Sequence, residues 1–77
     1  MTEAQIQKLL KSAFLKINGI YRITIKGRWN PTEIEARFIG LTKKGSLKFY
    51  ELYSFINDSW YQKHYFKPEQ IIKLEVL

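Results

Sequence analysis

The residues best suited to do chemistry in this 77-residue chain gather between Trp60 and Lys67, in the run Trp-Tyr-Gln-Lys-His-Tyr-Phe-Lys. If this run is a β-strand, alternation places Tyr61, Lys63 and Tyr65 together on one face and the intervening residues on the other. An aromatic–basic–aromatic row is the surface that stacks nucleic-acid bases and neutralises phosphates. The alternative interpretation is that these tyrosines pad a small β-core.

A second aromatic–basic group lies in the loop that Asn30-Pro31 marks. Lys26 and Arg28 place two cations beside Trp29, which favours the same stacking chemistry. The alternative is that Trp29 folds back over the end of the fold, in a turn made rigid by proline.

The charge balance supports a polyanionic partner, because thirteen Lys and Arg outnumber seven Asp and Glu, for a net charge of +6 and a pI near 9.7. We expect RNA or a single strand rather than duplex DNA, since the pattern contains no recognition helix. The residues predicted to bind nucleic acid, as phosphate contacts or base platforms, are Lys26, Arg28, Trp29, Lys43, Lys44, Lys48, Tyr61, Lys63, Tyr65 and Lys67.

Catalysis finds little support in the same sequence. One histidine and no cysteine rule out the usual zinc and iron–sulfur sites. The acidic residues are scattered, and the segment from Gly40 to Gly45 lacks the Lys-Ser/Thr of a phosphate loop. Turn formation explains the Asp and Ser residues nearest His64. We therefore expect a non-enzymatic protein without a catalytic residue, metal or cofactor.

The N-terminal segment has the period of an amphipathic helix over about residues 2–17. Thr2 and Gln5 form a capping-box pattern, and Asn18-Gly19 supplies the stop. The predicted apolar face consists of Ile6, Leu9, Leu10, Ala13, Phe14 and Ile17.

After Gly19 the apolar period changes to two, which predicts five strands, beginning near residues 21, 34, 47, 60 and 72. Hairpin turns are predicted at residues 43–45 and 57–59, a bend at Gly40 and a 3₁₀ turn at residues 67–70. The prediction is one α+β, mostly β domain over residues 1–77, with antiparallel strands over about 20–77. Five short bent strands close most readily into a small barrel, because closure removes exposed edges.

This order resembles the SH3-like small barrels, and among them the Sm-like variant. The resemblance rests on the helix before Asn18-Gly19, the bend at Gly40, the Lys-Lys-Gly hairpin and the segment Tyr65–Ile71. It implies a five-stranded antiparallel barrel with a helix over one end. Residues 28–31 read Arg-Trp-Asn-Pro where the Sm signature has an Asn-Gly pair, so no binding residue is carried over from the family.

Two alternatives concern protein partners. An exposed aromatic groove suits a protein-interaction module, or a small phage-type inhibitor of a nucleic-acid-handling enzyme. The final strand, Ile71–Leu77, is apolar on both faces and favours pairing between subunits in a homo-oligomer. Without cysteines, a membrane span or a signal peptide, we expect a cytoplasmic protein with no membrane partner.

Overall fold

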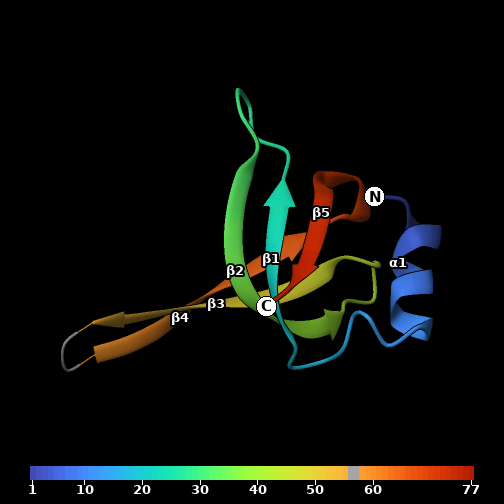
Figure 1. Ribbon diagram of the computed structural model, residues 1–77. Coiled ribbons are helices and arrows are strands. Elements are labelled where there is room, and N and C mark those ends of the chain that lie inside the picture. Colours follow the sequence, from blue (N-terminus) through green and yellow to red (C-terminus); the bar gives the residue numbers. More distant parts are fainter. Residues whose placement is uncertain (56–57) are drawn as a thin grey trace.

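The computed structural model describes the backbone of residues 1–55 and 58–77, and the side chains of residues 1–51 and 62–77. One helix precedes five antiparallel strands that form a single sheet, as the α+β, mostly β prediction states (Figure 1). The elements in chain order are α1 (Glu3–Lys11), β1 (Ile20–Ile25), β2 (Thr32–Leu41), β3 (Leu47–Phe55), β4 (Asp58–Phe66), the 3₁₀ turn η1 (Pro68–Gln70) and β5 (Ile71–Val76).

The sheet has the order β4-β3-β2-β1-β5, so β4 and β5 lie at its two edges. Residues 67–70 alone connect these edges, and three of them form η1. In a flat sheet the edges would be about 19 Å apart, at roughly 4.8 Å for each strand spacing. A linker of this length that includes a 3₁₀ turn is too short for that span. The sheet is therefore strongly curled, and a bulge at Gly40 (φ 141°) bends β2 (Figure 1).

The start of α1 follows the predicted capping box. The Gln5 amide donates to the Thr2 hydroxyl at 3.2 Å, and the Thr2 amide donates to the Gln5 side chain at 2.8 Å. These bonds satisfy amides that have no partner within the helix. The helix then buries Ile6 against the sheet.

The end of α1 differs from the prediction, because the helix stops at Lys11 rather than near Ile17. Ala13 has φ 61°, a left-handed conformation that breaks the helix. The chain then turns so that Leu15 enters the core, with 2% of its surface exposed, while Phe14 and Ile17 are 38% and 65% exposed. Of the predicted apolar face, only Ile6, Leu9 and Leu10 therefore lie on the helix.

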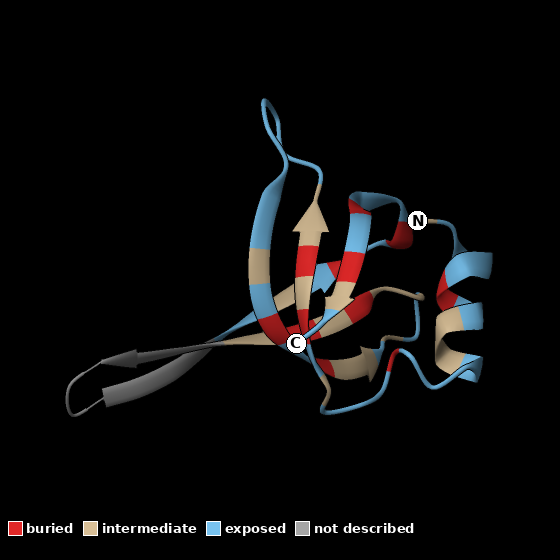
Figure 2. Ribbon diagram, viewed as in Figure 1, coloured by how far each residue is buried: buried red, intermediate tan, exposed pale blue. Residues whose placement is uncertain are grey.

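The core lies between the concave face of the sheet and α1 (Figure 2). Phe49 is central, with its ring centroid 5.4 Å from that of Phe38 and 6.1 Å from that of Phe66. Burying each such ring stabilises the fold by about 1.5–3 kcal/mol. The buried hydrophobic residues are Ile6, Leu15, Tyr21, Ile23, Ala36, Phe38, Leu47, Phe49, Phe66, Ile71 and Leu74.

Two details of the strands correct the sequence analysis. Asp58 and Ser59 belong to β4 rather than to a turn, because the ladder with β3 continues to the pair Phe55–Asp58, and Asn57 lies outside the described residues. In β5, a bulge in the pairing with β1 turns Ile71 into the core opposite Ile25, so Ile71 shares the buried side with Leu74. Across the described residues, no helix has the length and apolarity needed to span a membrane.

Candidate functional site

The outer face of β3 and β4 carries alternating tyrosines and cations. Along β3, Lys48 and Tyr50 point outward because their neighbours Leu47 and Phe49 fill the core. The antiparallel register places Tyr65 opposite Lys48 and Lys63 opposite Tyr50. Each ring thus has a cation across the strand and along it. These four residues, with Arg37 of β2 opposite Tyr50, are here called the tyrosine–cation platform.

The Lys48 ammonium lies close to both rings of the platform. Its Nζ lies 5.3 Å from the ring centroid of Tyr50 and 5.8 Å from that of Tyr65. Hydrogen bonding to Tyr50, with smaller contributions from Tyr65, raises the pKa of Lys48 above its ordinary value. Tyr65 is 52% exposed, which leaves much of its ring open to a ligand.

The platform contains two residues absent from the predicted set, Arg37 and Tyr50. A signal for both was present in the alternation. Phe38 and Phe49 face the core, so their neighbours Arg37 and Tyr50 must face outward. Alternation alone does not predict the strand register, which places Arg37 directly opposite Tyr50.

A groove of about 420 Å³ lies on the same outer face, beside Arg37 and Tyr50. Its apolar lining comes from Ile20, Ala36 and Ile39. The groove borders the platform on the side toward β1, and Glu35 also lines it.

The predicted residues Lys26, Arg28 and Trp29 lie apart from the platform. They belong to the β1–β2 loop, which projects away from the sheet, whereas the β3–β4 hairpin extends in another direction (Figure 1). Trp29 is 85% exposed, and the Arg28 guanidinium carbon is 5.7 Å from its ring centroid. The interpretation that Trp29 folds back over the fold is therefore wrong. Gly27 permits this loop, since a Cβ there would lie 1.9 Å from the Asn30 carbonyl oxygen.

The other predicted cations lie at one end of the sheet. Lys43 and Lys44 are exposed in the β2–β3 turn before Leu47, and Lys67 follows Phe66. Leu47 pairs with Phe66, so all three cations lie beyond the Lys48–Tyr65 end of the platform. Tyr61 belongs to β4, but its side chain lies outside the described part of the chain.

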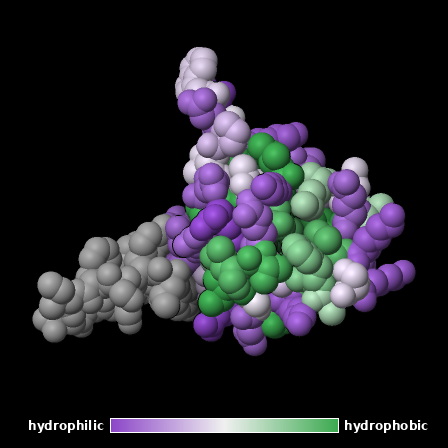
Figure 3. Space-filling model, in the orientation of Figure 1, coloured by the Kyte–Doolittle hydropathy of each residue, from purple (hydrophilic) through white to green (hydrophobic). Residues whose placement is uncertain are grey.

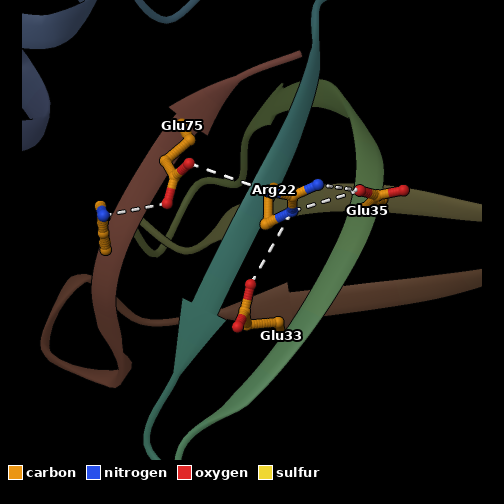
Figure 4. Close-up of polar contacts among 5 residues, drawn as sticks. Arg22, Glu33, Glu35 and Glu75 are labelled. Atoms are coloured by element: carbon orange, nitrogen blue, oxygen red, sulfur yellow. Dashed lines mark hydrogen bonds and ion pairs between the residues drawn. The ribbon is translucent and has the colours of Figure 1, made fainter.

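The outer face around β1 carries three carboxylates, which pair with Arg22 and Lys73. Arg22 of β1 lies 2.9 Å from Glu35, 3.8 Å from Glu33 and 3.9 Å from Glu75 (Figure 4). Hydrogen bonding and charge interaction with Glu35 raise the pKa of Arg22. Because three carboxylates surround one guanidinium, Arg22 offers no free charge to a polyanion. The outer face thus divides into a basic, aromatic part on β3 and β4 and a part around β1 whose cations are paired with carboxylates.

His64 lies on the inner face, away from the platform. Its Nε2 is 2.9 Å from Glu51 Oε1, and both side chains are 18% exposed. The His64 ring stacks on Phe66 with centroids 5.5 Å apart. His64 therefore lies at the edge of the core. Among the described residues, His, Asp and Glu side chains form no group of three or more that could hold a metal ion.

Comparison with known proteins does not assign the chain to a family. No protein-family model, curated protein or solved structure matches the chain.

Proposed function

We propose that this chain is a non-enzymatic nucleic-acid-binding protein that holds a single strand, RNA in preference to duplex DNA, on the tyrosine–cation platform. The observation that carries the proposal is the alternation of Lys48, Tyr50, Lys63 and Tyr65 across two paired strands. Aromatic rings on a sheet stack bases, and cations between them neutralise the phosphates.

The platform suits successive nucleotides of a flexible strand. Tyr50 and Tyr65 lie on a diagonal of the β3–β4 ladder, a separation of about 7–8 Å between such neighbours. Lys63 and Arg37 flank Tyr50, so a strand that stacks there meets a cation on either side. The carboxylates around Arg22 repel phosphates and confine the strand to β3 and β4.

For the fold, we propose an SH3-like small barrel of the Sm-like kind. Its supports are the strand order β4-β3-β2-β1-β5, the strong curl and the 3₁₀ turn before β5. The Arg-Trp-Asn-Pro segment at residues 28–31 departs from the Sm signature. The proposed binding mode therefore depends on the residues of the platform and not on the family.

The test is fluorescence anisotropy of labelled 12-nucleotide oligo(U) and oligo(dT), titrated with the whole chain at several salt concentrations. Three platform cations predict a slope of log K against log salt of roughly −2, from about −0.7 for each phosphate contact of a single strand. Lys63→Gln should reduce that slope by about 0.7. Tyr65→Ala should weaken binding by about 1–3 kcal/mol, the typical contribution of one stacked base.

Lys8→Gln is the matched control, because it removes the same charge from an exposed position on α1. If Lys8→Gln and Lys63→Gln weaken binding equally, only net charge matters and the platform is not the site. Absence of binding to both oligonucleotides at low salt would refute the proposed function.

A second candidate function follows from the apolar groove beside Arg37. Ile20 and Ile39 could receive an apolar side chain of a peptide, with Arg37 contacting an acidic residue next to it. Ile20→Asp discriminates the two functions: it should abolish peptide binding, while oligonucleotide binding to β3 and β4 persists.

A further inference from the structure

The β5 strand forms one edge of the sheet, and beyond the bulge opposite Ile25 its residues 73–76 pair with β1 in regular antiparallel register. The Leu77 amide donates to the Ile20 carbonyl at 3.1 Å, which continues the β1–β5 ladder past the end of β5. Backbone groups of alternate residues in an antiparallel strand point to opposite sides. The backbone N–H and C=O groups therefore point toward β1 at Lys73, Glu75 and Leu77. At Leu74 and Val76 they point away from β1.

The charged side chains of this strand are complementary about Leu74. Residues 72–76 are Ile-Lys-Leu-Glu-Val, so equal steps from Leu74 meet a lysine and a glutamate, and then two β-branched apolar residues. An antiparallel pair of identical strands places residues related in this way opposite each other. The charges on the two sides are then of opposite sign.

We propose that a second copy of this chain binds along the β5 edge, antiparallel, with Leu74 at the two-fold axis. Leu74 of each copy forms the hydrogen-bonded pair, because its backbone groups already point outward. Lys73 then faces Glu75 of the second copy in the closer, non-hydrogen-bonded kind of pair. Ile72 faces Val76 of the second copy. The interface is isologous, as a two-fold dimer requires.

The exposed apolar surface next to this edge supports the same partner. Val76, Leu77 and Ile20 are 59%, 53% and 47% exposed, and they line one hollow together with Phe14. Figure 3 shows apolar side chains gathered where Figure 1 places the C-terminus. Contiguous apolar surface beside an open strand edge marks an interaction site.

The charged residues at the edge are free to change partners. Lys73 lies 3.0 Å from Glu75 within the chain, and their side chains are 64% and 39% exposed. An exposed pair of this kind holds its geometry weakly, so exchange with the same residues of a second copy costs little. The proposal does not depend on the proposed function, since the platform lies on β3 and β4.

The test uses two charge-reversed chains, Lys73→Glu and Glu75→Lys, in sedimentation equilibrium beside the natural chain. The natural chain should show twice the 9.2 kDa chain mass. Each variant alone places like charges opposite each other and should dissociate at least tenfold more readily. An equimolar mixture should restore the dimer, because the glutamate introduced at position 73 meets the lysine introduced at position 75. Neither mixed chain keeps an internal Lys–Glu pair there, so restoration reports a contact between chains.

Three outcomes of this test overturn the proposal: a natural chain that stays monomeric at millimolar concentration, variants that dimerise as well as the natural chain, or a mixture that remains monomeric while circular dichroism shows both variants folded.

Hydrogen exchange of the natural chain gives a measurement that needs no variant. The Leu74 and Val76 amides should exchange at least tenfold more slowly at high than at low protein concentration. Equal exchange at both concentrations also overturns the proposal.

Discussion

Removing the hydroxyl of Tyr21 should destabilise the fold by about 2 kcal/mol. This hydroxyl donates to the Phe14 carbonyl and accepts from the Lys16 amide, both at 2.7 Å, and Tyr21 is 2% exposed. Tyr21→Phe keeps the buried ring and opens no large cavity, so the cost is that of two hydrogen bonds at about 0.5–1.5 kcal/mol each. In a domain of this size, 2 kcal/mol lowers the Tm by roughly 10 °C.

The assay is urea unfolding followed by circular dichroism, with Tyr65→Phe as the matched control. Tyr65 is 52% exposed, so its hydroxyl should change the free energy of unfolding by no more than about 0.5 kcal/mol. Hydrogen exchange should also show that the Lys16 amide loses protection in Tyr21→Phe. If the two variants are equally stable, the Tyr21 hydroxyl does not hold the segment after α1.

Two further variants test the bend in β2 and the charge pair in β5. Gly40→Ala should lower the free energy of unfolding in urea by about 1–3 kcal/mol, because the backbone φ of 141° is strained for alanine. Space is not the reason, since a Cβ there meets only an Ile17 methyl at 4.0 Å. A loss below about 0.5 kcal/mol would show that the bulge relaxes. Lys73 holds the pKa of Glu75 below its ordinary value by a hydrogen bond and by charge. The resulting stabilisation is present above the carboxyl's unfolded pKa and is lost as the pH falls through the lower folded pKa. Lys73→Met should therefore flatten the decline in Tm between about pH 5 and pH 3, measured at low protein concentration, and an unchanged decline would contradict the pairing.

The elements of this fold follow from local patterns. Alternation identifies β1, β2 and β3, because inward residues such as Ile23 and Phe38 recur every second position. The end of α1 does not follow from such a pattern. Periodicity continues through Phe14 and Ile17, but the Tyr21 hydroxyl competes for the backbone of residues 14 and 16 from another element. A tertiary contact of this kind leaves no trace in helical spacing.

The part of the candidate site that lies on a single strand could be predicted from the sequence. The part that depends on how two strands pair could not. Lys63 and Tyr65 share a face of one strand, and alternation predicts this directly. Their meeting with Lys48 and Tyr50 depends on how β3 pairs with β4, which is a property of two segments. Trp29 was predicted from its neighbouring cations in a loop, and the structure shows that this loop projects away from the platform.

The two proposed interfaces are compatible because the platform uses the outer face of β3 and β4, whereas the dimer uses the edge strand β5. Antiparallel pairing at β5 makes a continuous sheet in the order β4-β3-β2-β1-β5-β5-β1-β2-β3-β4, whose outer faces lie on the same side. The carboxylates around Arg22 then lie between the two platforms. A polyanion crossing from one platform to the other would pass over this acidic surface, which repels it. The dimer therefore presents two separate basic sites, each set by the local charges of β3 and β4 rather than by the net charge of +6. Loss of either interface leaves the residues of the other in place.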